Sequence, residues 1–187
     1  LGLPGDFTPP SRFVRAAFLK TYSLEQNNAY DTVIRAFHIL NNFDIPVAEM
    51  AEVHTPDKKT MEEVCEYLNA DLKLSCKAVV YQKNADDKFV VAFTRGDFEV
   101  NETKLRNLVG EEIHPAVIDE ESPVVAGFIG PVGLSKDVEV YYDLSLKGIP
   151  ALVAGANKID YHFTGVNLER DVEGVVYHDI AKVVEGG

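Results

Sequence analysis

Four segments of the chain repeat apolar residues at the spacing of one helix face. The first two are residues 11–20, which follow a Pro/Gly-rich start, and residues 28–41. The third follows Thr60, which together with Glu63 makes a capping-box sequence at a helix start. A fourth, shorter segment runs over residues 101–110, between a capping Asn and a closing Gly. The third segment is the best defined, because its apolar positions keep the i, i+3, i+4, i+7 spacing: Met61, Val64, Cys65 and Leu68.

Other segments favour β-strands. Residues 76–82 and 88–94 are rich in β-branched and aromatic residues, and the sequence NADD between them predicts a hairpin. Residues 138–143 also have the composition of a strand. Short strands that alternate with a few helices predict an α+β fold, with a mixed central sheet flanked by helices. Because Pro46 disfavours helix at the residue before it, we expect a helical segment over residues 1–47 and a separate domain over residues 48–187.

The charge differs between these two parts. The whole chain has 18 basic and 30 acidic residues, a net charge of -12. Residues 1–47 hold four of each sign, so the entire excess of acid lies in residues 48–187. No apolar run approaches the ~20 residues of a membrane span, and the composition is that of a globular protein. The acidity argues against a broad nucleic-acid-binding face unless positive charge is gathered locally.

Several common site chemistries are missing from the sequence. It contains no G-x-S-x-G, Walker A or His-Glu-x-x-His motif, and its five histidines never stand at metal-ligand spacing. We therefore expect no metal and no cofactor. Cys65 and Cys76 are expected to be buried free thiols, and the Arg95–Asp97 RGD sequence a turn at a strand end.

Three features remain that folding alone does not require. Lys77 stands among apolar strand residues, where the alternative is a strand-edge lysine with its head in water. The sequence GFIGPVG, residues 127–133, forms a loop whose backbone could approach a ligand, or an ordinary turn. Residues 155–167 gather small residues, an amide and His162, again with an ordinary loop as the alternative.

Residues 53–171 resemble the editing insertion domain of bacterial prolyl-tRNA synthetases, which is related to the free-standing YbaK-like aminoacyl-tRNA deacylases. The resemblance rests on the ordered segments EVHTP, TMEEVCEYL, CKAVVYQ, FTRGDFEVNETKLRNL, GFIGPVGL and VAGANKIDYHFTGVNLERD. It implies hydrolysis of misacylated tRNA, chiefly alanine attached to proline tRNA. The glycine-proline stretch is shorter here than in many members, and we take Gly127 as its first glycine.

The resemblance also implies site residues. The family's essential lysine corresponds to Lys77, and Gly130 is the second expected catalytic position. His162 is expected to bound the amino-acid pocket. The expected substrate-binding positions are Gly127, Pro131, Gly155, Asn157 and His162.

Residues 1–47 resemble a different family, the choloylglycine hydrolases and penicillin V acylases, most clearly in LPGDFTPPSRFVRAAF. The catalytic arginine of those N-terminal-nucleophile hydrolases would correspond to Arg12, or to Arg15. Their nucleophile is an N-terminal cysteine, whereas this chain begins with Leu1 and has no cysteine before Cys65. The segment is expected to be either a fusion or a helical appendage.

The leading hypothesis from the sequence is a cytoplasmic editing deacylase. Its expected partners are the acylated 3′ end of proline tRNA and the remaining domains of a prolyl-tRNA synthetase, and no membrane is expected. The alternatives are a non-catalytic editing-like module that binds tRNA or a synthetase, and a fragment of a bile-salt or penicillin amide hydrolase.

Overall fold

The computed structural model describes residues 48–182. The two helices expected over residues 11–20 and 28–41 lie outside the described residues, and the boundary between residues 47 and 48 stays a prediction. Within residues 48–182 there are eight strands and three α-helices. The strands are β1 (Ala51–His54), β2 (Ser75–Lys83), β3 (Phe89–Arg95), β4 (Ile113–Pro115), β5 (Glu139–Asp143), β6 (Leu152–Gly155), β7 (Tyr161–Val166) and β8 (Tyr177–His178). The α-helices are α3 (Met61–Leu68), α4 (Glu102–Val109) and α5 (Leu168–Asp171), with 3-10 turns at Leu72–Leu74 and Leu144–Leu146.

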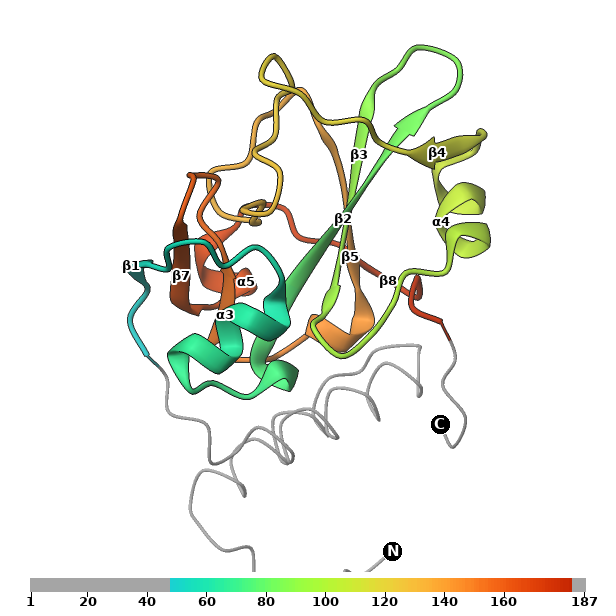
Figure 1. The fold of residues 1–187 in the computed structure, drawn as a ribbon. Coiled ribbons are helices and arrows are strands. Elements are labelled where there is room, and N and C mark those ends of the chain that lie inside the picture. The colour runs from blue at the N-terminus through green and yellow to red at the C-terminus, as the bar shows by residue number, and fades with distance from the viewer. Residues whose placement is uncertain (1–47, 183–187) are drawn as a thin grey trace, which may run out of the picture. The chain divides into compact units, whose positions relative to one another are not determined.

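All eight strands join one mixed sheet (Figure 1), in the order β1-β7-β6-β2-β3-β5-β8, with β4 paired to the far end of β2. The β2–β3 pair is antiparallel, as the hairpin sequence predicts, and runs from Cys76 opposite Arg95 to Gln82 opposite Phe89. The β2–β6, β3–β5 and β5–β8 pairs are parallel. The predicted α+β fold with a mixed central sheet is confirmed.

The helix ends follow their capping residues. The Thr60 side chain accepts from the Glu63 amide, while the Glu63 carboxylate accepts from the Thr60 amide, so both halves of the capping box are present. Asn101 caps α4, and Gly110 ends that helix with a φ of 80°. Both helix boundaries predicted from sequence are confirmed.

The two faces of the hairpin support two separate apolar cores. On one face, Cys76, Val91 and Phe93 belong to the larger cluster, which extends to Leu146, Leu152 and Leu168. On the other face, Tyr81, Val90 and Ala92 pack with Leu105 of α4. Successive side chains of β3 point to opposite faces of the sheet, and each face is covered by one of these clusters. For this reason the consecutive residues Val90 through Thr94 are all buried.

Two smaller predictions are also confirmed. Cys65 and Cys76 are free and buried. The RGD sequence forms a turn at the end of β3, in which Arg95 Nε lies 2.6 Å from Asp97 Oδ1 and the Gly96 amide donates to the Ser75 carbonyl.

Candidate functional site

A cavity of about 230 Å³ opens at the start of α3. Its walls come from three separate parts of the chain, which the sheet brings together. We call it the Lys77 cavity. It is lined by Lys59, Thr60, Met61, Glu62, Lys77, Ala78, Gly127 and Ile129.

Lys77 reaches this cavity from an interior strand. It pairs with Thr94 of β3, and the two residues before it pair with Val153 and Ala154 of β6. In the strand order β2 lies between β6 and β3, although its pairing with β6 covers only Ser75 and Cys76, the two residues before Lys77. The side chain is half-buried and forms no ion pair among residues 48–182, although its charge, after that of Lys182, helps to lower the pKa of Glu99.

The glycine-proline loop is held against the end of β6 by direct backbone contact. A Cβ on Gly130 would lie 1.6 Å from the Gly155 carbonyl oxygen, and a Cβ on Gly155 would lie 2.3 Å from the Phe128 carbonyl oxygen. Only glycine fits at either position, because no side chain atom can come that close to a carbonyl.

Asn157 locks the same loop through its side chain. Its Oδ1 accepts from the Gly130 amide at 3.0 Å, and its Nδ2 donates to the carbonyls of Gly130 and Val132. The Gly130 amide is therefore already engaged. The amides of Gly127 and Ile129, which flank the Lys77 cavity, have no hydrogen-bond partner within the described residues. Gly127 has a φ of 81°, a conformation that favours glycine.

His162 lies behind this loop. It is fully buried in β7, and its ring centroid is 5.7 Å from that of Phe128. Its Nδ1 forms a 2.6 Å hydrogen bond with the buried Thr55 hydroxyl, whereas its Nε2 has no partner among residues 48–182. Burial lowers the pKa of His162 to about 4, so the ring is neutral at pH 7. Through Thr55, the structure fixes the orientation of a neutral imidazole with one free nitrogen.

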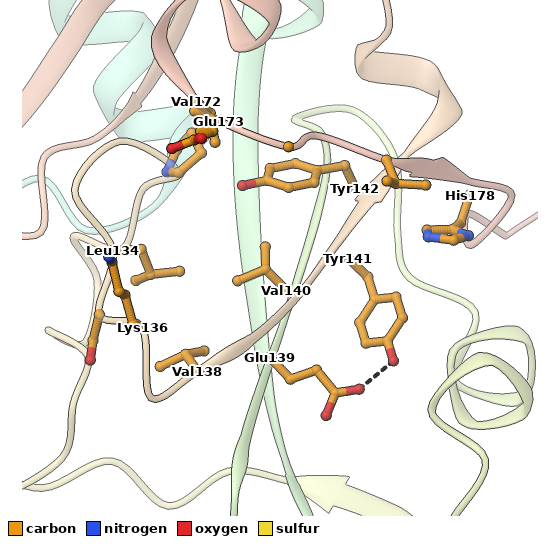
Figure 2. A pocket seen from close by; sticks show the side chains of 14 residues that line it. Leu134, Lys136, Val138, Glu139, Val140, Tyr141, Tyr142, Val172, Glu173 and His178 are labelled. Carbon is orange, nitrogen blue, oxygen red and sulfur yellow. Dashed lines mark hydrogen bonds between the residues drawn. The ribbon is translucent and has the colours of Figure 1, made fainter.

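Pro131 lies on the other side of the loop. It lines a second, larger hollow of about 500 Å³ beside β5, which we call the β5 hollow. Figure 2 shows Leu134, Val138 and Val140 on one side of this strand, with Glu139 and Tyr141 hydrogen-bonded to each other on the other side. The structure thus places Pro131 away from the lining of the Lys77 cavity.

The predicted site residues form one connected region rather than one pocket. Lys77 and Gly127 share the Lys77 cavity, while Gly130, Gly155 and Asn157 hold the loop that forms its wall. His162 contacts that loop through Phe128. Their individual roles stay predictions.

Sequence reasoning missed Lys59, Glu62 and Thr55. The first two flank the capping box and line the cavity, and Thr55 orients His162. The capping-box sequence could have identified Lys59 and Glu62, because it determines where α3 begins and therefore which side chains lie at the start of the helix.

No group of three or more His, Cys, Asp or Glu residues is arranged to hold a metal ion within residues 48–182. Over the same residues, no helix has the length and apolar character needed to cross a bilayer.

Two family models match the chain. Residues 55–171 match the model of the aminoacyl-tRNA editing domain family. Residues 1–68 match a second model, that of linear amide C–N hydrolases of the choloylglycine hydrolase family, and the two matches overlap over residues 55–68.

The curated relatives include proline–tRNA ligases. The chain is 42% identical to the ligase of Bacillus pumilus over 142 residues, which cover 74% of the chain and 25% of the ligase. It is 35% identical to that of Bacillus subtilis over 175 residues, covering 89% of the chain and 30% of the ligase. The chain thus spans about a quarter of the length of these relatives.

Solved structures share the fold at low sequence identity. One, assigned provisionally as a trans-editing enzyme for prolyl tRNA synthetase, matches with a TM-score of 0.61 at 17% identity, covering 95% of this chain and 99% of that one. A hypothetical protein matches with a TM-score of 0.62 at 16% identity, covering 77% of this chain and 96% of its own. With the family model matched over residues 55–171, the chain belongs to the aminoacyl-tRNA editing domain family.

Proposed function

We propose that this chain hydrolyses the ester bond of misacylated tRNA. The observation that carries the proposal is the Lys77 cavity, in which an unpaired lysine from an interior strand faces a glycine loop. The chain has a net charge of -12, but the cavity carries positive charge locally. Such local positive charge is sufficient to bind the end of a nucleic acid.

The reaction needs no protein nucleophile, because an aminoacyl ester is already activated. A water molecule attacks the ester carbonyl, a tetrahedral oxyanion forms, and the bond to the ribose oxygen then breaks. The ribose oxygen takes up a proton, and the free amino acid and the tRNA leave. The site must therefore position the ester and water and stabilise negative charge on the carbonyl oxygen.

The described residues offer donors for these tasks. Lys77 supplies a positive charge for the developing oxyanion or the terminal phosphate. The Gly127 and Ile129 amides have no partner within residues 48–182, so they are the loop donors available to an oxyanion. Gly130, whose amide is bound by Asn157, contributes by holding the loop in place. A neighbouring ribose hydroxyl of the substrate would orient the water.

His162 is suited to bounding the amino-acid pocket rather than to acting as a general base. With a pKa of about 4, its imidazole has little affinity for the proton that a base must accept at pH 7. We therefore expect His162→Ala to change which amino acids are released more than it changes the rate on alanine. An unchanged amino-acid profile would contradict the pocket role.

The favoured substrate is alanine attached to proline tRNA. The support is the similarity to proline–tRNA ligases. A pocket that excludes by size rejects a larger residue more sharply than a large pocket rejects a smaller one. On this proposal the chain acts in the cytoplasm, and other domains of a prolyl-tRNA synthetase deliver the tRNA.

Deacylation assays with purified chain test the proposal. We expect release of alanine from alanyl-tRNA(Pro) above the rate without protein, and no acceleration with prolyl-tRNA(Pro). Binding of the tRNA end without release of alanine would instead identify a non-catalytic editing-like module.

A further inference from the structure

Lys59 is anchored at the mouth of the Lys77 cavity by two contacts. Its backbone amide donates to the Glu63 carboxylate at 3.1 Å, so the capping box of α3 fixes its main chain. Its stem lies against Gly127, where a Cβ would come within 3.1 Å of Lys59 Cβ and 3.2 Å of Lys59 Cγ. The residue is exposed, yet its backbone and stem are held at the cavity.

The ammonium group of Lys59 has no ion pair within the described residues. Most other cations of residues 48–182 do pair with carboxylates: Lys83, Lys88, Arg95, Lys104, Arg106, Lys158, Arg170 and Lys182. Lys58, Lys59, Lys73, Lys77 and Lys136 have no such ion pair within residues 48–182, and of these five only Lys59 and Lys77 line the Lys77 cavity. The only carboxylate among the lining residues is Glu62, so the lining carries one net positive charge.

Two unpaired lysines on one cavity of an acidic chain favour a ligand with more than one negative centre. The end of an acylated tRNA has two such centres during hydrolysis, the phosphodiester before the terminal adenosine and the oxyanion at the ester. Lys77 extends from a strand of the sheet, whereas Lys59 is exposed at the start of α3.

We propose that Lys59 is the phosphate-binding residue of the site and contacts the phosphodiester on the 5′ side of the terminal adenosine. This inference rests on the proposed function. It gives the two lysines different roles: Lys59 binds the phosphodiester, and Lys77 stabilises the oxyanion at the ester. Lys59 then contributes to substrate binding and not to the chemical step. Lysine is suited to this role as a compact charge with rotatable donors.

The test is single-turnover deacylation of alanyl-tRNA(Pro) at increasing concentrations of wild-type chain, Lys59→Ala, Lys59→Arg and Lys58→Ala. Lys58 is the matched control, because it is the neighbouring lysine and does not line the cavity. Thermal unfolding of each variant establishes that it is folded.

We expect Lys59→Ala to raise the half-saturating concentration five- to tenfold and to leave the maximal rate within twofold. Lys59→Arg should keep most of the affinity, and Lys58→Ala should match the wild type. Loss of one phosphate contact should also reduce the slope of log affinity against log salt by about 0.7, the value for single-stranded nucleic acid.

Two results would overturn the inference: an unchanged half-saturating concentration, or a fall in maximal rate at unchanged affinity. Failure of the proposed function gives a different result, because the wild-type chain would then release no alanine. In that case, fluorescence anisotropy with a labelled RNA oligonucleotide ending in CCA still measures whether Lys59→Ala weakens binding relative to Lys58→Ala.

Discussion

The glycine-proline loop separates two hollows that differ in size and in chemistry. The β5 hollow measures about 500 Å³ and the Lys77 cavity about 230 Å³. In the larger hollow, Glu139 is bound by Lys83 at 2.6 Å and by the Tyr141 hydroxyl. Burial, together with the hydrogen bond to Glu139, raises the pKa of Tyr141 to about 12. In the smaller cavity, neither lysine forms an ion pair within residues 48–182, as is also true of Lys136 in the larger hollow.

On our proposal, the larger of the two hollows is not the reactive site, so volume alone does not identify it. Charged groups that pair with one another stabilise the structure and have little left to offer a ligand. Unpaired cations beside a glycine loop keep their capacity for an anionic substrate. On our proposal the chemistry takes place in the Lys77 cavity, and the β5 hollow has no catalytic role.

The largest expected effect is the loss of Lys77. If its charge stabilises the oxyanion, Lys77→Ala should lower the single-turnover deacylation rate by about 10²- to 10³-fold. Lys136→Ala is the matched control, since Lys136 lines only the β5 hollow, and its rate should stay within twofold of the wild type. Deacylation by Lys77→Ala at the wild-type rate would contradict the assignment, as would a large loss in Lys136→Ala.

The next effect concerns the loop between the two hollows. Gly130→Ala would place a Cβ 1.6 Å from a carbonyl oxygen, so the loop must move away from β6. We expect it to destabilise the chain by about 3 kcal/mol in urea unfolding. Gly133→Ala is the comparison, because its Cβ meets nothing within 4 Å and only its φ of 72° is unfavourable, at about 1 kcal/mol. Equal losses in the two variants would show that the close approach to β6 is not a constraint.

The smallest effect is a pH dependence set by His162. Burial holds its pKa at about 4, below the ~6.5 of an unfolded chain. As the pH falls below 6.5 the unfolded state gains a proton that the folded state does not, so stability falls until about pH 4. Between pH 7 and pH 5, this group should remove about 2 kcal/mol, at ~1.4 kcal/mol per pH unit.

Urea unfolding of wild type and His162→Gln at both pH values measures this contribution as a difference. The variant should lose less stability than the wild type on acidification. An identical loss in both proteins would mean that His162 titrates normally and is not enclosed as described.

Much of the fold was predictable because local signals are strong here. The capping box at Thr60, the hairpin over residues 76–94 and the closing Gly110 each require only neighbouring residues. The placement of Lys77 on an interior strand was not predictable from pattern. It depends on the parallel pairing of β2 with β6, which is about 75 residues away in sequence.

The candidate site was predictable only in part, for a similar reason. The family resemblance identified Lys77, the loop glycines and His162, but not which of them share a cavity. Gly130 has no room for a side chain because the Gly155 carbonyl lies against it, and Thr55 orients His162 through a hydrogen bond. Both contacts join segments that are far apart in the sequence, so the sequence pattern does not reveal them. The domain boundary near residue 47 stays a prediction. The amide-hydrolase match extends to residue 68. In the structure, however, β1 and α3, which lie before residue 69, are part of the editing domain, because β1 pairs with β7 and α3 lines the Lys77 cavity.

The most direct test of the central claim is to locate the acylated adenosine end on the chain. Amide resonances of ¹⁵N-labelled protein would be followed during titration with 3′-alanylamino-3′-deoxyadenosine, a hydrolysis-resistant mimic of that end. Our account predicts the largest shifts at Lys77, Gly127 and Ile129, with little change at Val140 and Val176 of the β5 hollow. Shifts concentrated at Val140 and Val176, with Lys77 and Gly127 unmoved, would contradict it.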